Sequence, residues 1–170
     1  MTHRENFQRW FVNYLRSLAG ERDAGFIVAM VTFSLLERYV RQLTNSKPKS
    51  PKFLAGLRHV LPDLLTQADA RVFWSTYRNG LLHHVTLSRE THGLTHDSSR
   101  AVEVRSDGKV WLNPDRFCRE VLSAIENDFA MFECGMPLST VYVDNPPQPT
   151  PGVPNPYLGT GVPPGQGRKI

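Results

Sequence analysis

The chain has little cysteine and no sequence pattern of a metal site. Among its 170 residues only Cys118 and Cys134 are cysteines. Both fall on one predicted helix, whose rise would separate them by about 24 Å. A disulfide needs a far shorter distance, so we expect two reduced thiols, buried or half-buried, as in cytosolic proteins. Because neither a CxxC pair nor an HExxH pattern occurs, we predict no metal site and no cofactor.

Features of membrane and secreted proteins are also missing from the sequence. No run of eighteen apolar residues occurs, so we expect no membrane span and no membrane partner. The polar start, Met1 to Asn6, is followed by no signal-like apolar core. We therefore expect a cytoplasmic protein. Internal repeats are absent as well.

The composition of the chain and the distribution of its prolines suit one globular domain followed by a tail. Hydrophobic residues make up 40% of the chain, enough for one sizeable core. The net charge of +4 and the pI of about 9.3 permit an RNA partner without requiring one. Nine of the thirteen prolines follow residue 136, so we predict a domain over 1–136 and an irregular tail over 137–170. The tail is either flexible or docks a partner through Tyr142 and Tyr157.

The spacing of apolar residues predicts a mainly α fold. Helical periodicity covers residues 3–19, 22–44, 53–61, 69–84 and 113–134. Residues 22–44 are apolar nearly all round, which predicts a central helix buried on every side that also lines a dimer interface. Alternating residues over 101–112, with Asp107-Gly108 at the turn, predict a small β-hairpin. We therefore expect an up-and-down bundle of four to five helices with a hairpin insertion.

Polar chemistry is concentrated where the helix predicted over 69–84 ends. Arg78, Asn79, His83 and His84 fall within seven residues, and Asn79 and His83 share a helix face. A guanidinium binds phosphate oxygens in a bidentate manner, and an imidazole transfers protons near neutral pH. The two groups together can cleave RNA without a metal ion. The alternative is a polar helix end whose arginine is favoured by the helix dipole.

The segment Tyr77-Arg78-Asn79-Gly80-Leu81-Leu82-His83 resembles the signature of the HEPN superfamily, in which an arginine and a polar residue precede a histidine. That resemblance implies a helical bundle that forms a homodimer with a composite active site. It implies a metal-independent endoribonuclease of a toxin–antitoxin, phage-defence or RNA-processing system. Arg78 would then stabilise the phosphorane, Asn79 would orient the phosphate or the imidazole, and His83 would transfer protons. His84 also fits the spacing, but only His83 shares a face with Asn79.

Cationic residues between the second and third predicted helices suit an RNA backbone. Lys47, Lys49 and Lys52 lie in a proline-containing loop, and Arg41 precedes them near a helix end. Such a run is also typical of a solvated surface. Glu37 forms either an i, i+4 pair with Arg41 or part of a site around Arg78.

Three functional hypotheses follow from the residues and the resemblance. The first is the homodimeric endoribonuclease, with an antitoxin or another protein bound through the tail. The alternative is a non-catalytic HEPN-like module for dimerisation and for RNA or protein binding. The third is a structural helical bundle. The polar segment 88–100, with His92, His96 and Asp97, is expected to be a surface loop rather than a metal site.

Overall fold

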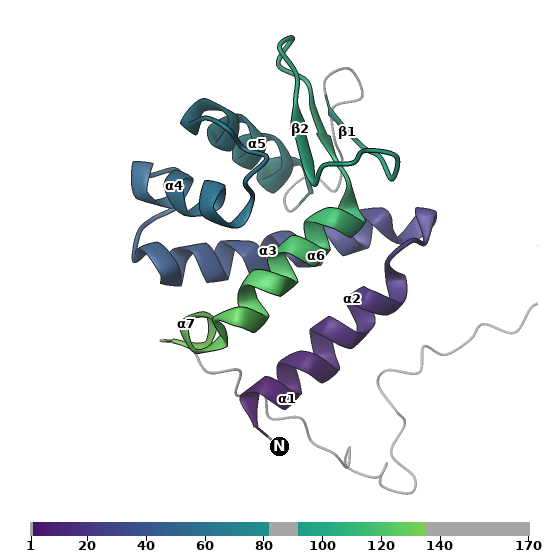
Figure 1. The fold of residues 1–170 in the computed structure, drawn as a ribbon, viewed down its shortest axis with the longest axis vertical. Coiled ribbons are helices and arrows are strands. Elements are labelled where there is room, and N and C mark those ends of the chain that lie inside the picture. Colours follow the sequence, from purple (N-terminus) through teal and green to yellow (C-terminus); the bar gives the residue numbers. More distant parts are fainter. Residues whose placement is uncertain (1, 82–91, 135–170) are drawn as a thin grey trace, which may run out of the picture. The chain divides into compact units, whose positions relative to one another are not determined.

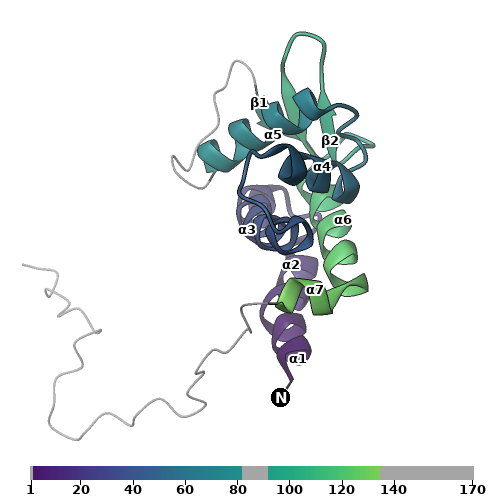
Figure 2. The same ribbon diagram turned by 90° about the vertical axis from the view of Figure 1, so that its left-hand side faces the viewer.

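A long central helix, α3, organises the described part of the chain. The structure is a computed structural model that describes residues 2–81 and 92–134 (Figures 1 and 2). Helix α3 (Gly25–Thr44) follows the short 3₁₀ helix η2 (Arg22–Ala24) and contacts helices α2, α4, α6 and α7. The fold is mainly helical with a small three-stranded sheet, which confirms the predicted class.

The first predicted helix is continuous but not uniform. Helix α1 (His3–Phe7), the π-helical segment η1 (Gln8–Val12) and helix α2 (Asn13–Leu18) follow one another with α-helical dihedrals at each junction. A π segment adds residues to a turn and so rotates the buried face. Val12 is therefore fully buried, whereas Tyr14, which the regular helical spacing places in the buried stripe, is 65% exposed.

Helix α3 is buried on most of its circumference but not on all of it. Ile27 is 56% exposed, Met30 and Val31 are half-buried, and Ser34 is exposed. Their spacings of three and four residues place these side chains on one face of the helix. The prediction that this helix is buried on every side is therefore wrong, because no described element covers that face.

Helices α4 and α5 begin at capping residues. Ser50 accepts a hydrogen bond from Phe53 N at the start of α4 (Pro51–Val60). Thr66 and Asp69 form a capping box at the start of α5 (Gln67–Asn79). The chain continues in π-helical geometry through 80–81, and the predicted extension to His84 lies outside the described residues.

The aromatic core holds α5 against α3. Phe33 on α3 lies 4.8–6.2 Å, between ring centroids, from Phe73, Trp74 and Tyr77 of α5 and from Phe117 of α6. All five side chains are buried. Because aromatic rings contribute large buried areas, this cluster fixes α5 firmly against the central helix.

The small sheet contains the predicted hairpin and one further strand. Strands β2 (Val102–Val104) and β3 (Val110–Leu112) are antiparallel, which confirms the hairpin, and Gly108 supplies the positive φ of its turn. Strand β1 (His92–Leu94) pairs in parallel with β3. The prediction of a loop over 88–100 is therefore wrong at this strand, since three residues are too few to show alternation.

The last predicted helix is broken into two. Asn113 caps α6 (Pro114–Asn127) as expected, accepting hydrogen bonds from two backbone N–H groups. The helix ends at Asp128, whose φ of −132° and ψ of 52° are not helical, and α7 (Phe129–Glu133) follows. The break lets Phe129 and Phe132 pack on Phe7, with ring centroids 5.4 and 5.1 Å away. The prediction of one helix over 113–134 is wrong for this reason.

Both cysteines are free thiols, as predicted, but the expectation that both are buried or half-buried is wrong for Cys134, which lies beyond the end of α7. Cys118 is buried on α6, and Cys134 is exposed just beyond α7. Burial raises the pKa of the Cys118 thiol above its ordinary value, so this side chain behaves as a small apolar residue of the core.

Candidate functional site: a cationic hollow beside Arg78

The motif arginine lies against the middle of the central helix. Arg78 is in the last turn of α5, and its Nε is 3.6 Å from Oε2 of Glu37 on α3. Glu37 is also 3.9 Å from Nη1 of Arg41, one helical turn further along. The predicted i, i+4 pair with Arg41 is thus present, and the same carboxylate also contacts Arg78, so it lies between two guanidinium groups.

A hollow opens on the same side of α3. It has a volume of about 620 Å³, and Glu37 forms part of its wall. Its other lining residues come from the second half of α3 and the following loop: Ser34, Arg38, Arg41, Gln42, Asn45, Ser46 and Lys47. Because three cationic side chains and one carboxylate line it, this "cationic hollow" favours an anionic ligand.

The structure brings together two of the four residues predicted to bind RNA. Arg41 and Lys47 line the cationic hollow. Lys49 and Lys52 are exposed but do not line it. Lys49 has a φ of 69°, so the loop changes direction there before α4 begins.

Arg38 belongs to the hollow and was not among the predicted site residues. Its Nε donates a hydrogen bond to Phe132 O at 3.1 Å, and its guanidinium lies 4.7 Å from the centroid of the Phe132 ring. Burial lowers the pKa of Arg38, against the opposing effect of Glu133. In the sequence, only the spacing between Arg38 and Arg41 could have predicted that Arg38 lines the hollow, since residues three apart share a helix face.

The sheet positions the end of α5 that carries Arg78. Tyr77 is fully buried, and its hydroxyl lies 2.8 Å from Gly93 O on β1 and 2.8 Å from Val110 O on β3. Gly93 passes under the Trp111 ring, where a Cβ would come within 2.5 Å of a ring carbon. The sheet insertion thus contacts the residue next to Arg78 in the chain.

The side chains of the other three predicted catalytic residues are not described. The side chain of Asn79 and the whole of His83 and His84 lie outside the described residues. Their catalytic roles stay predictions. Arg78 is therefore the one predicted catalytic side chain whose surroundings the structure defines.

His96 has a structural role in the described fold. Its Nδ1 lies 2.9 Å from Oδ2 of Asp115, and the other oxygen of Asp115 accepts a hydrogen bond from Gly20 N at 3.0 Å. This contact ties the segment after β1 to the start of α6 and to the turn before η2. In residues 2–81 and 92–134, no group of three or more histidine, cysteine, aspartate or glutamate residues could hold a metal ion.

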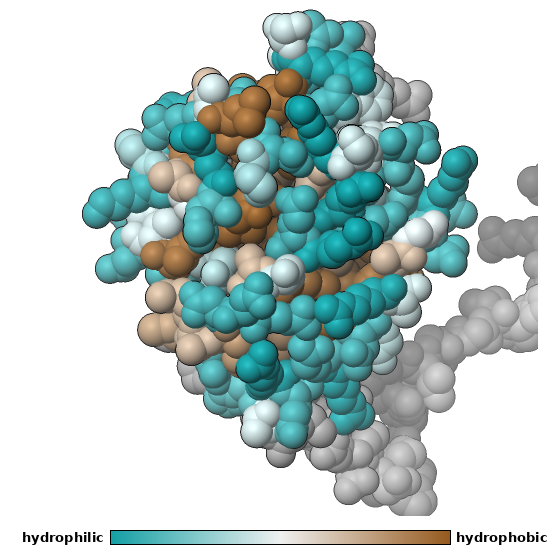
Figure 3. Space-filling view, in the orientation of Figure 1, coloured by the Kyte–Doolittle hydropathy of each residue, from teal (hydrophilic) through white to brown (hydrophobic). Residues whose placement is uncertain are grey.

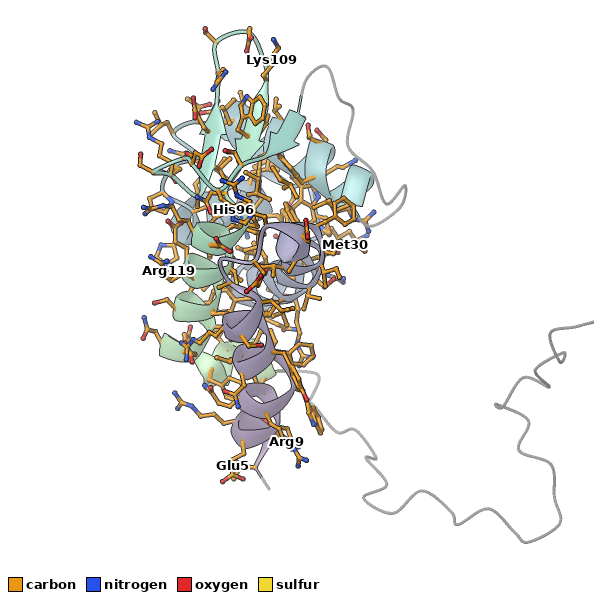
Figure 4. All side chains as sticks on the ribbon, turned by 90° about the vertical axis from the view of Figure 1, so that its right-hand side faces the viewer. Glu5, Arg9, Met30, His96, Lys109 and Arg119 are labelled. Atoms are coloured by element: carbon orange, nitrogen blue, oxygen red, sulfur yellow. The ribbon has the colours of Figure 1, made fainter. Side chains whose placement is uncertain are left out.

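The exposed face of α3 changes character along its length. Its first half is apolar at Ile27, Met30 and Val31, and its second half carries the charged side chains of Glu37 and Arg41. Met30 projects from the opposite side of the molecule to Arg119 of α6 (Figure 4). An apolar surface therefore adjoins the cationic hollow directly.

Comparisons of the chain with protein-family models, with curated proteins and with solved structures found no match. No helix in the described part of the chain is both long enough and apolar enough to cross a membrane.

Proposed function

We propose that this protein is a metal-independent endoribonuclease that acts as a homodimer. The observation that supports this most is the position of Arg78, which meets Glu37 at the wall of a hollow lined by Arg38, Arg41 and Lys47. The motif that contains Arg78 and the cations Arg41 and Lys47 come from different parts of the sequence. Their proximity in the fold suits a phosphodiester substrate.

The reaction would be an attack of the RNA 2'-hydroxyl on the adjacent phosphorus. His83 would transfer the proton, with His84 as the other candidate for that role. Arg78 would stabilise the charge on the phosphorane, and Asn79 would orient the phosphate or the imidazole. The 5'-oxygen leaves with a proton, so the products would carry a 2',3'-cyclic phosphate and a 5'-hydroxyl.

Glu37 would act as a counter-ion that the substrate displaces. Partly exposed ion pairs contribute only roughly 0–1 kcal/mol, and the 3.6 Å separation from Arg78 is longer than a good hydrogen bond. A phosphate that binds the guanidinium in a bidentate manner makes a stronger contact. Arg41 and Lys47 would then hold the neighbouring phosphates.

The exposed face of α3 would form the dimer interface. It presents Ile27, Met30 and Val31 to solvent beside the cationic hollow. A two-fold axis pairs the same patch on both subunits, so a second copy docked here would bring a second Arg78 motif toward the first. Both sets of cations would then contribute to one site.

The alternative function is a non-catalytic HEPN-like module that dimerises and binds RNA or protein. The observation that favours it is the ion pair between Arg78 and Glu37. In such a module, Glu37 would hold Arg78 permanently, and the hollow would bind an RNA backbone without cleaving it. A protein partner through the tail belongs to either proposal, and the tail lies outside the described residues.

RNA cleavage in EDTA tests the proposal directly. Purified wild type, Arg78→Ala and His83→Ala are incubated with structured and unstructured RNA, beside the control Arg9→Ala. Arg9 is exposed on η1 (Figure 4), far from α5. We expect cleavage by wild type and Arg9→Ala alone. Cleavage that persists in Arg78→Ala and His83→Ala refutes the proposal, and RNA binding without cleavage by any protein supports the non-catalytic module.

Light scattering after size exclusion tests the interface. We expect a dimer for wild type and a monomer for Ile27→Glu, because the carboxylate would be buried at the two-fold contact. The control is Leu65→Glu, which changes another exposed apolar side chain, 69% exposed and not on α3. A monomeric wild type, or a dimer unaffected by Ile27→Glu, contradicts the assignment of this face.

A further inference from the structure

A second hollow lies on the other side of α3, between α4 and α6. It has a volume of about 660 Å³, within the range of small-molecule sites. Leu43, Val60 and Ala124 supply apolar parts of its wall. The polar parts include two carboxylates, one guanidinium, one imidazole and one hydroxyl, from Glu120, Asp128, Arg119, His59 and Tyr39. Figure 3 shows apolar surface among hydrophilic side chains on the face that α6 crosses. We call this site the acidic hollow.

The two hollows are separate sites. Tyr39 and Leu43 lie on the opposite side of α3 from Glu37 and Arg41, because a helix turns by about 100° per residue. Arg119, at the edge of the acidic hollow, projects away from the side on which Met30 lies (Figure 4). The acidic hollow therefore takes no part in the proposed cleavage site.

Glu120 is the unusual group of the acidic hollow. Its Oε2 is buried and has no hydrogen-bond partner among the described residues. Burial raises the pKa of this carboxyl, and the nearby charge of Asp63 raises it further, while Arg116 and Arg119 oppose the shift. A buried acceptor without a donor is costly in a folded protein. A ligand in the hollow would remove that cost if the carboxyl group rotates to bring this oxygen to the ligand's donor.

The neighbouring carboxylates are already occupied. Asp63 accepts hydrogen bonds from Ala101 N at 2.8 Å and from Val102 N at 3.3 Å. Asp128 hydrogen-bonds with the hydroxyl of Tyr39, whose own pKa is raised by burial and by that carboxylate. Tyr39 is only 4% exposed, so this pair is fixed. Glu120 is thus the carboxylate of the hollow with a buried oxygen that lacks a donor within residues 2–81 and 92–134.

We propose that the acidic hollow binds a small organic cation, an ammonium or guanidinium group on a short aliphatic chain. Glu120 would accept hydrogen bonds from the charged nitrogen groups of the ligand, and such bonds are stronger than those between neutral groups. Leu43, Val60 and Ala124 would contact the methylene groups of the chain. An anion would meet two carboxylates, Glu120 and Asp128, against the single guanidinium of Arg119. A neutral apolar molecule would leave the Glu120 carboxylate unpaired.

Titration with agmatine tests this assignment. This probe carries a guanidinium and an amine on a butyl chain, and 1-pentanol and glutarate serve as neutral and anionic comparisons. We expect saturable calorimetric binding of agmatine alone, with NMR shifts confined to amides around the hollow, such as those of Ser123 and Asn127. No saturable binding by the wild-type protein at millimolar agmatine, or equal binding of 1-pentanol, overturns the proposal.

Two variants and one control locate the binding. Glu120→Gln keeps the shape of the side chain and is expected to weaken agmatine binding at least tenfold. Ala124→Leu fills part of the wall and is expected to weaken it as well, with an unfolding transition that shows an intact fold. The control Glu103→Gln changes a carboxylate of β2 and should bind as wild type does. Unchanged binding by Glu120→Gln overturns the proposal.

Discussion

Replacing Tyr77 by phenylalanine tests whether the sheet holds the end of α5. The Tyr77 hydroxyl contacts Gly93 O and Val110 O at 2.8 Å each, and the ring packs against Phe33 and Phe73. Phenylalanine keeps that ring packing and removes only the hydroxyl. One lost hydrogen bond costs about 1 kcal/mol, and a buried carbonyl left without a donor costs about 1–3 kcal/mol. We therefore expect the free energy of unfolding to fall by about 1–3 kcal/mol.

Urea unfolding followed by circular dichroism measures that change. The matched control is Tyr14→Phe, because Tyr14 is 65% exposed on α2, and a substitution there should change the free energy of unfolding by less than about 0.5 kcal/mol. A loss of less than about 0.5 kcal/mol for Tyr77→Phe would refute the reasoning, since the hydroxyl would then not hold the sheet to α5.

The pH dependence of the same pair of proteins gives a second readout. Burial raises the pKa of Tyr77 above the value near 10 of a free tyrosine. Above about pH 10 the unfolded chain therefore loses the Tyr77 proton while the folded chain keeps it, so stability falls as the pH rises. The variant lacks this contribution. The advantage of wild type over Tyr77→Phe should accordingly shrink above pH 10, and a constant difference would contradict the burial of the hydroxyl.

Three further substitutions test the packing, a helix cap and the acidic hollow. Gly56→Ala should lower the free energy of unfolding by about 1–3 kcal/mol, since the new Cβ would lie 2.5 Å from Thr44 Cγ2 and 2.9 Å from Val40 Cγ1; an unchanged urea midpoint contradicts this. Asn113→Ala should lower it by about 2–4 kcal/mol in the same assay, because the side chain caps α6 and donates to two backbone carbonyls; a loss below about 1 kcal/mol contradicts it. Glu120→Gln should raise the thermal midpoint at neutral pH, since burial and then Asp63 raise the pKa of the carboxyl. As the pH falls toward that raised pKa, the thermal midpoint of wild type should rise relative to that of the variant, because the folded state binds the Glu120 proton more readily than the unfolded state does. A lower midpoint for the variant at pH 7 contradicts this.

The sequence by itself determined the features that depend on neighbouring residues. Asn113 followed by Pro114 marks a helix start, and the observed cap is the one that these residue types form. Asp107-Gly108 marks a hairpin turn, and Gly108 adopts the positive φ that this turn needs. Local hydrogen bonding and steric limits decide such features, so the mainly α class and the hairpin could be read directly from the chain.

Tertiary contacts decided the features that regular periodicity predicted wrongly. The π segment rotates the first helix so that Val12 is buried and Tyr14 exposed. Apolar residues at helical spacing continue on both sides of Asp128, but the helix breaks there, and the break lets Phe129 and Phe132 pack on Phe7. Packing against distant residues overrides local helix preference at such positions.

In the two candidate sites, the sequence likewise predicted some of the residues, and the tertiary structure decided which of them lie together. The motif containing Arg78 and the cations Arg41 and Lys47 were recognisable as separate groups in the sequence. Only the fold places Glu37 between two arginines. Only the fold leaves Glu120 with a buried oxygen that has no partner in the described part of the chain. The reason is physical: each site joins residues from helices far apart in the chain, and spacing along one helix carries no information about which other helix packs against it.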